Sequence, residues 1–224
     1  MWSILKNNHK TQMVTTDQAL PGRQQAIEIH EPHSIFACSL SAYTLRENKE
    51  SSVKRIIFGM GCFWGAERLF WQCEGVVCTS VGYAGGFTPN PSYQEVCTGL
   101  TGHTEVVQVD FDPTRVSLKH LLKLFWESHD PTQEMRQGND IGTQYRSAIY
   151  WTNPSQVIEI TASQSAFQAE LAQVDQSDAH SQKIYTEINA LDVYYFAELE
   201  HQQYLHKNPN GYCGLKGTGI QCVW

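Results

Sequence analysis

Cys62 lies in the sequence Gly-Cys-Phe-Trp-Gly (61–65), between an apolar strand-like run at 56–58 and a helix-like run at 66–71. The free N–H groups and the positive dipole end of a helix start favour thiolate over thiol, and glycines let a substrate approach the sulfur closely. The pattern therefore predicts a reactive thiol, although most free cysteines are buried structural residues. Phe63 and Trp64 are suited to wall a small apolar pocket beside the sulfur.

Glu105 is the second residue that suggests chemistry, because strand periodicity places it on the same face as Val107, Val109 and Phe111. A carboxylate in this position lies either at the exposed end of the strand or inside the protein. If it is buried beside Cys62, loss of hydration raises its pKa, so that it stays protonated near neutral pH and can act as a general acid. The sequence leaves both placements open.

Two tyrosines are candidates to bind an oxygen atom next to such an acid. Tyr145 is predicted to share a strand face with Ile149 and Trp151, and Tyr93 lies in a Gly/Pro-rich loop. Buried tyrosines commonly serve as core residues with a hydrogen-bonded hydroxyl. Together with a carboxylic acid, these two hydroxyls would form a donor set around one oxygen.

The C-terminal residues carry two further thiols. Cys213 and Cys222 flank a Gly-rich stretch without an apolar face, which predicts a mobile segment. Thiol–disulfide exchange needs in-line approach of one sulfur to another, so mobility suits thiols that resolve an oxidised Cys62 and pass the oxidation outward. The simpler alternative is that Cys222 is an exposed thiol close to the chain end.

Composition limits the possible partners. The chain has 224 residues, of which 41% are hydrophobic and 17% are charged, as expected for one globular domain with an appended arm. A net charge of −7 argues against polynucleotide or anionic-membrane partners. No apolar run reaches the roughly 18 residues of a membrane span, and the first residues lack a signal or transit pattern. We therefore expect a cytoplasmic protein with no nucleic-acid or membrane partner.

The seven cysteines do not suggest a disulfide framework, because their number is odd and no secretory signal is present. The cysteine and histidine pairs lack the C-x2-C spacing of structural zinc sites, so no metal is expected. No phosphate-binding glycine motif indicates a nucleotide cofactor. The remaining cysteines are interpreted as small hydrophobic residues: Cys38, Cys73, Cys78 and Cys97.

Residues 1–52 are predicted to form a surface arm, 53–208 the catalytic domain and 209–224 a mobile tail. Hydrophobic periodicity predicts a β-α-β-β-α-β order, which is an α+β fold with a ferredoxin-like split β-α-β sheet core, helices packed on it and a Gly-rich coil tail. The expected strands are 53–59, 76–83, 104–111, 145–151 and 183–188. The expected helices are 63–73, one from Ser117, one from Asn153 to about 174, and 198–205, with loops at 84–103 and 129–143.

Several motifs in order resemble class A peptide methionine sulfoxide reductases over residues 53–222, and residues 17–23 resemble the arm of bacterial members. The motifs are Gly-Cys-Phe-Trp-Gly (61–65), Gly-Tyr-Ala-Gly-Gly (82–86), Gly-His-Thr-Glu (102–105), Gly-Asn-Asp-Ile-Gly-Thr-Gln-Tyr-Arg-Ser (138–147) and His-Gln-Gln-Tyr-Leu (201–205).

The resemblance implies reduction of the S epimer of methionine sulfoxide, free or in proteins, without a metal or organic cofactor. It makes Cys62 the nucleophile and Glu105 the proton donor, while the hydroxyls of Tyr93 and Tyr145 bind the developing hydroxyl group. The residues that it implies for substrate binding are Phe63, Trp64, Asp140 and Tyr212.

The same resemblance implies a Cys62 sulfenic acid, a Cys62–Cys213 disulfide and then a Cys213–Cys222 disulfide that thioredoxin reduces, in a monomeric protein. The chain departs from the family pattern at Lys216, where glycine is frequent, and ends at Trp224, soon after Cys222. Cys73 and Cys78 are additional candidates for resolving thiols.

Two other classes of function remain as alternatives. A thiol peroxidase would use the same Cys62 sulfenic acid chemistry on hydroperoxides and would consume peroxide faster than it reduces sulfoxides. A zinc-supported binding module would hold stoichiometric zinc and unfold with a chelator.

Overall fold

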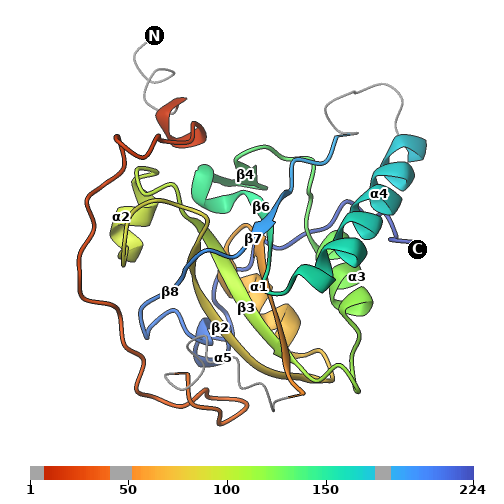
Figure 1. Cartoon of the computed structure of the whole chain (residues 1–224), viewed down its shortest axis with the longest axis horizontal. Helices are drawn as coiled ribbons and strands as arrows, with labels where there is room; N and C mark the ends of the chain where they lie inside the picture. The colour runs from red at the N-terminus through yellow and green to blue at the C-terminus, as the bar shows by residue number, and fades with distance from the viewer. Residues whose placement is uncertain (1–7, 41–51, 175–182) are drawn as a thin grey trace.

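The computed structural model of the chain describes residues 8–40, 52–174 and 183–224 (Figure 1). A mixed sheet runs through the molecule in the order β7-β6-β1-β3-β2-β8, and its neighbouring strands are antiparallel except for the parallel pair β6 and β7. This confirms an α+β protein. The strands are β1 (Lys54–Met60), β2 (Val76–Ala84), β3 (Thr104–Phe111), β6 (Ser147–Trp151), β7 (Glu187–Ala190) and β8 (Tyr194–Phe196).

Three helices cover one face of the sheet: α1 (Phe63–Trp71), α3 (Leu118–Ser128) and α4 (Val157–Val174). Figure 1 shows α3 and α4 side by side. Their apolar faces meet alternate residues of β1 and β3, such as Phe58 and Val107, in the main core. The smaller elements are α2 (Tyr93–Cys97), α5 (Tyr204–Lys207), the hairpin of β4 (Arg136–Gln137) and β5 (Asp140–Ile141), and the 3-10 helices η1 (Asn8–Thr11), η3 (Thr143–Tyr145) and η4 (Pro154–Gln156).

Local signals place the helix starts correctly. The Ser117 side chain accepts a hydrogen bond from the His120 N–H at the start of α3. Asn153 and Gln156 form a reciprocal capping box around Pro154, directly before α4. None of the helices among the described residues is long and apolar enough to cross a membrane.

Several predicted boundaries are wrong. The loop at 84–103 contains α2, and the loop at 129–143 contains the β4–β5 hairpin. Tyr145 is not in a strand, because Gly142, with φ 150°, starts a 3-10 turn that places the strand start at Ser147. The last predicted strand begins at Glu187 instead of 183. Glu187 is the first residue of this strand that pairs with β6.

The predicted helix at 198–205 is also wrong, since only Tyr204–Lys207 is helical. Gln203 has a left-handed φ of 49°, which interrupts any continuous helix before this point. The Gln202 side chain accepts a hydrogen bond from the Val81 N–H and donates one to the Val81 carbonyl, so the segment is bound to β2 as a turn.

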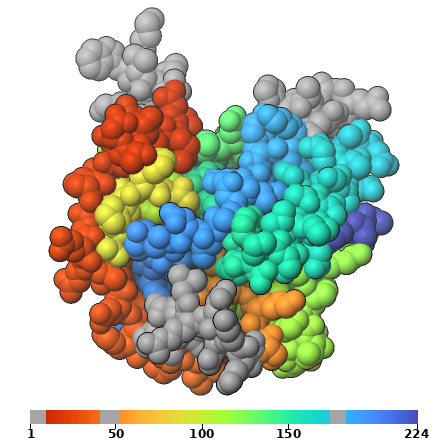
Figure 2. Space-filling view, viewed as in Figure 1, coloured from red at the N-terminus to blue at the C-terminus, as the bar shows by residue number. Residues whose placement is uncertain are grey.

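The sequence suggested no disulfide framework and indicated Cys38 and Cys78 as small hydrophobic residues, and this expectation is wrong for the two residues. They form a disulfide between the N-terminal segment and β2, across 40 residues of sequence. Spacing alone does not reveal this pair, because it depends on how the segment 8–40 folds back over the sheet. Figure 2 shows the red part of this segment against the yellow region around α2, where Leu20 N–H donates to the Leu100 carbonyl.

The C-terminal residues after α5 contain no helix or strand, but they do not lack an apolar face. Leu215, Ile220 and Trp224 pack against the main core, and the Cys222 residue is only 2% exposed. The alternative of an exposed Cys222 thiol is therefore wrong in this structure, where burial of apolar side chains holds the tail.

Candidate active site

Cys62 is the N-cap residue of α1, and Gly61 alone separates it from the end of β1. Backbone N–H groups of Trp64 and Gly65 favour the thiolate, as the helix start predicts. Burial and the nearby Glu105 carboxylate act more strongly in the other direction, so the pKa of Cys62 is raised well above its ordinary value. The helix start therefore favours the thiolate as the sequence predicts, but in the free protein burial outweighs this effect on the pKa of Cys62.

Glu105, the second residue of β3, is buried with 2% of its surface exposed. Its Oε2 accepts a hydrogen bond from the Phe63 N–H at 3.0 Å, which places the carboxyl beside Cys62. Burial raises the pKa of Glu105 to about 8, helped by the charge of Asp140 and opposed by the Phe63 hydrogen bond. Of the two placements that the sequence left open, the structure has the buried one.

Tyr93 and Tyr145 come to the neighbourhood of this carboxyl from two separate short helices. Tyr93 begins α2, and its N–H donates to Glu198 Oε1 at 2.8 Å. Tyr145 ends η3. Burial raises the pKa of both phenols, and the negative charge of Glu105 raises both further, so both remain O–H donors. The Tyr93 hydroxyl also hydrogen-bonds Cys97.

Phe63 and Trp64 contribute to an aromatic wall around the site. Phe63 is buried, and Trp64 stacks on Tyr204 with ring centroids 3.9 Å apart. The Trp64 Nε1–H donates to His201 Nδ1 at 3.3 Å, and the His201 ring lies 4.4 Å from the ring of Tyr93. The wall therefore combines residues of α1, α2 and the segment around α5.

Sequence reasoning assigned no role to Glu198, His201 or Tyr204. Glu198 accepts hydrogen bonds from the Tyr93 N–H and from the Tyr83 hydroxyl, and His201 orients Trp64. Their regular three-residue spacing suggests one shared face of a helix, but only Tyr204 is helical, as the first residue of α5, and Glu198 and His201 lie in the irregular segment before it.

Asp140 and Tyr212 form a polar edge next to the same site. The Tyr212 hydroxyl donates to Asp140 Oδ2 at 3.1 Å, and 46% of Tyr212 is exposed. Burial raises the pKa of Asp140, while this hydrogen bond lowers it. Asp140 also raises the pKa values of Cys62 and Glu105, as expected for a carboxylate on their side of the molecule.

The two tail cysteines lie in different places. A Cβ atom added to Gly65 would stand 2.9 Å from Cys213 Sγ, so Cys213 rests on the first turn of α1, close to Cys62. Cys222 is buried against α3, where its N–H donates to Glu127 Oε1 at 2.8 Å. Burial and the Glu127 charge raise the pKa of Cys222 to about 11. The structure therefore brings Cys213 to the site, and not Cys222.

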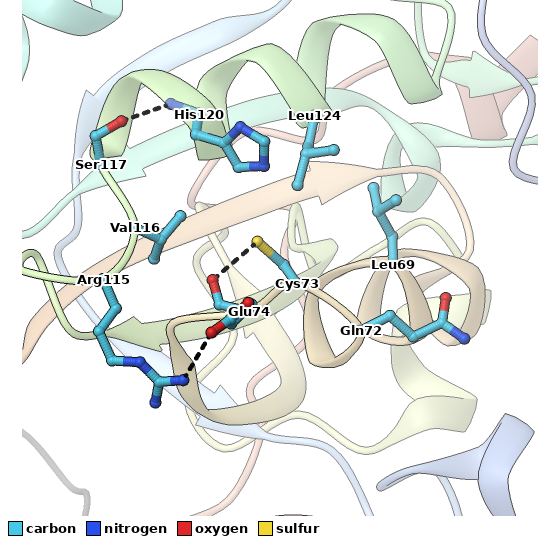
Figure 3. A pocket seen from close by; sticks show the side chains of 9 residues that line it. All are labelled: Leu69, Gln72, Cys73, Glu74, Arg115, Val116, Ser117, His120 and Leu124. Atoms are coloured by element: carbon cyan, nitrogen blue, oxygen red, sulfur yellow. Dashed lines mark hydrogen bonds and ion pairs between the residues drawn. The ribbon is translucent and has the colours of Figure 1, made fainter.

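A separate cavity of about 600 Å³ lies between the end of α1 and the start of α3 (Figure 3) and contains none of these residues. Cys73 lines it, and its thiol donates to the Glu74 carbonyl. Because α1 lies between Cys62 and Cys73, the rise of a helix separates them by roughly 16 Å. This separation argues against Cys73 as a resolving thiol, and the disulfide occupies Cys78.

Among the described residues, no cluster of three or more His, Cys, Asp or Glu side chains is arranged to hold a metal ion. The chemistry available is that of a thiol, a carboxylic acid and two phenols. A thiol beside proton donors can accept an oxygen atom from a substrate, and a second thiol nearby can then remove it as water. The fold and site thus define a thiol-dependent oxidoreductase.

Comparison with known proteins gives the family. Residues 54–221 match the family model for peptide methionine sulfoxide reductase. A peptide methionine sulfoxide reductase MsrA of Pseudomonas putida (strain W619) is 58% identical over 95% of this chain and 92% of its own. One of Vibrio cholerae (strain M66-2) is 58% identical, over 94% of this chain and 95% of its own.

Solved structures agree with this assignment. Methionine sulfoxide reductase A of Corynebacterium diphtheriae is 43% identical, with a TM-score of 0.76 over 94% of this chain and 98% of its own. Mxr1 of Saccharomyces cerevisiae in reduced form is 35% identical, with a TM-score of 0.64 over 73% and 92%. The chain belongs to the peptide methionine sulfoxide reductase family.

Proposed function

We propose that this chain reduces the S epimer of methionine sulfoxide, free and within polypeptides, to methionine. The observation that carries the proposal is the placement of a buried carboxyl, with its pKa raised to about 8, next to the N-cap cysteine of α1. A sulfoxide sulfur becomes electrophilic when its oxygen is protonated, so the acid and the thiol must face the same S–O group.

In the first step the sulfoxide oxygen accepts hydrogen bonds from Glu105 and from the hydroxyls of Tyr93 and Tyr145. Because the charge of Glu105 raises the pKa of Cys62, the thiolate is favoured when Glu105 is protonated. Cys62 attacks the sulfoxide sulfur as Glu105 protonates the oxygen. The hydroxyl group then moves to Cys62, which leaves a Cys62 sulfenic acid and releases methionine.

The next steps restore the thiol. Cys213 attacks the sulfenic sulfur, water leaves, and a Cys62–Cys213 disulfide forms. Cys222 then attacks Cys213, which frees Cys62, and a dithiol reductant of the thioredoxin type reduces the Cys213–Cys222 disulfide. Since Cys222 is buried against α3, we propose that the tail leaves the core for this exchange.

Selectivity for the S epimer follows from the shape of a pyramidal sulfur, whose oxygen and methyl group occupy different directions. The acid and the phenols define the direction of the oxygen, and the aromatic wall of Phe63 and Trp64 receives the methyl group. Asp140 and Tyr212, at the polar edge, are placed to bind the amide or amino group of the substrate.

We also propose that β6, β1, β3 and β2 form a ferredoxin-like split β-α-β core, which their order and antiparallel register support. The division into an arm (1–52), a catalytic domain (53–208) and a tail (209–224) remains a proposal, as do the cytoplasmic location and the monomeric state.

The test mixes protein whose catalytic thiols are reduced with each epimer of methionine sulfoxide, with no added reductant, and counts methionine and free thiols. About one methionine per chain, or two once Cys222 has freed Cys62, and a loss of two or more of the five free thiols, with the S epimer only, is the expected result. No methionine from either epimer overturns the proposal. A parallel reaction with a hydroperoxide tests the thiol peroxidase alternative through the rate of peroxide loss.

A further inference from the structure

The disulfide between Cys38 and Cys78 lies outside the catalytic site, in a small apolar cluster. Cys78 is 1% exposed, and Cys38 is half-buried. Cys38 belongs to the N-terminal segment and Cys78 belongs to β2, so this bond joins the segment covalently to the sheet. The cluster contains Ile29, Leu40 and Cys78, with Ile27, Cys38 and Phe196 packed against it.

Cys38 closes a tight turn that positions His33. The His33 N–H donates to the Cys38 carbonyl at 2.8 Å, and the Ala37 N–H donates to the His33 carbonyl at 2.9 Å. Ala37 has a left-handed φ of 53°, which alanine rarely adopts without surrounding contacts to hold it. The position of the Cys38 backbone therefore determines where the His33 side chain enters the protein.

His33 is 1% exposed and donates to Thr79, the residue after Cys78. Its Nδ1 accepts the N–H groups of Ile35 and Phe36, at 3.0 and 3.2 Å. The ring proton is therefore on Nε2, which lies 2.9 Å from Thr79 Oγ1. Both cysteines of the disulfide are thus connected to one hydrogen-bond network. Cys38 is connected through its backbone hydrogen bond with His33, and Cys78 is connected because Thr79 follows it in the sequence.

This hydrogen-bond network continues to α1, the helix that Cys62 caps. The Thr79 hydroxyl donates to Oε1 of Glu67, a fully buried residue of α1. Gln203 donates to both oxygens of Glu67, from its N–H at 2.8 Å and from its Nε2 at 2.9 Å. The next residue, Tyr204, stacks on Trp64. The hydrogen bonds that join the N-terminal segment to α1 therefore reach Gln203, the neighbour of Tyr204 in the aromatic wall of the site.

We propose that Cys38 and Cys78 are a redox couple, separate from the catalytic cysteines, whose oxidation fixes His33 in this network and so sets the position of the Trp64–Tyr204 wall. The consequence for catalysis rests on the proposed function, whereas the couple itself does not. Under the oxidising conditions that produce methionine sulfoxide, the disulfide would hold the substrate wall in its binding position.

The chemistry uses a hydroperoxide as oxidant and a dithiol as reductant. One thiolate attacks the peroxide oxygen, which gives a sulfenic acid and an alcohol or water, and the second thiol displaces hydroxide as water to form the S–S bond. In the reverse direction a dithiol attacks the half-buried Cys38 sulfur and then closes its own disulfide, so both cysteines return as thiols.

The first experiment tests the couple without using activity. The whole chain is equilibrated in buffers of reduced and oxidised dithiothreitol, free thiols are alkylated, and peptides are mapped without reduction. We expect Cys38 and Cys78 to change together and reversibly from alkylated to disulfide-linked as the buffer becomes more oxidising. Recovery of both as alkylated thiols in every buffer, including fully oxidised dithiothreitol, overturns the proposal.

The second experiment tests the consequence with Cys38→Ser, which cannot form the bond, and Thr79→Val, which keeps the bond but removes the hydroxyl relay. Cys73→Ser is the matched control, because Cys73 is also a half-buried cysteine outside the catalytic set. In both test variants, compared with the oxidised wild type, we expect faster amide hydrogen exchange at Gln203 and Tyr204, and no change in the control.

In a methionine burst with the S epimer, both test variants should need about three- to tenfold more substrate for the half-maximal rate, the factor for one lost buried hydrogen bond, with little change at saturation. Equal exchange rates and equal substrate dependence in Cys38→Ser and the oxidised wild type overturn the proposal. If no protein makes methionine, the proposed function fails, while the exchange rates and peptide maps still decide the proposal about the disulfide.

Discussion

The Phe63 N–H and Glu105 Oε2 lie 3.0 Å apart, which joins the first residue of α1 to the start of β3 and places a carboxyl beside the cysteine that caps the helix. This hydrogen bond uses one of the N–H groups that a helix start leaves without a partner. This hydrogen bond lowers the pKa of Glu105, but burial raises it by more, so the pKa is still about 8.

Glu105→Gln should slow methionine formation in a single turnover by about 10²- to 10⁴-fold, the usual contribution of a general acid. The amide still accepts the Phe63 hydrogen bond, so the fold and substrate binding should persist. Rapid-quench measurement of methionine checks this, with Glu74→Gln as a control, because Glu74 is an exposed carboxylate near the far end of α1. An unchanged rate in Glu105→Gln would remove its role as the acid.

The single-turnover rate of the wild type should fall as the pH rises through about 8. Glu105 donates its proton only in the acid form, and its pKa of about 8 sets the midpoint of that loss. The measurement is a series of single-turnover rates between pH 6 and about 9.5. This fall in rate at high pH should be absent in Glu105→Gln. If the fall persists in that variant, the group that titrates is not Glu105.

The raised pKa of Glu105 also predicts how the stability of the folded protein depends on pH. The folded protein holds the Glu105 proton more tightly than the unfolded chain does, so this contribution is fully present below the unfolded pKa and is lost as the pH rises to about 8. The free energy of unfolding should therefore fall less steeply over this range in Glu105→Gln, by up to about 1.4 kcal/mol per pH unit. Urea unfolding at several pH values measures the slopes, and parallel slopes would contradict the assigned pKa.

The sequence predicted those parts of the fold that local patterns determine. Strand periodicity placed β3 correctly at 104–111, and side-chain caps placed the starts of α3 and of η4–α4. The start of β6 and the ends of β7 depend on the turn at Gly142 and on pairing between distant strands, which a single segment does not show. The Cys38–Cys78 disulfide was missed for the same reason.

The site shows a similar division. Motifs indicated Cys62 and Glu105, but the direction of the Cys62 pKa shift follows from burial, which only the packed structure reveals. Glu198 and His201 contact the aromatic wall through turns that helical periodicity does not describe. The docked position of Cys222 depends on Leu215, Ile220 and Trp224, which pack against the main core. These three residues are spaced apart in a Gly-rich sequence, so no local pattern indicates that they share an apolar face.

Cys222→Ser should leave the rate of the first methionine turnover unchanged but reduce steady-state turnover with a thioredoxin-type reductant by at least about tenfold, because the Cys62–Cys213 disulfide would have no internal thiol to attack it. The comparison measures the burst and the steady state on one preparation, with Cys73→Ser as the control thiol variant. Steady-state turnover equal to that of the wild type would show that the reductant reaches the Cys62–Cys213 disulfide directly.

Gly65→Ala should separate the two halves of the cycle. The added Cβ would stand 2.9 Å from Cys213 Sγ and 3.1 Å from Leu215 Cβ, so the tail must move away from α1. Alanine favours a helix over glycine by up to about 1 kcal/mol, so the helix itself should persist. The methionine burst should therefore remain near the wild-type size, while formation of the Cys62–Cys213 disulfide slows by about tenfold or more. Trapping the sulfenic acid with a dimedone-type reagent at timed intervals measures this lifetime, and a wild-type lifetime would mean that Cys213 attacks from a position other than the one beside Gly65.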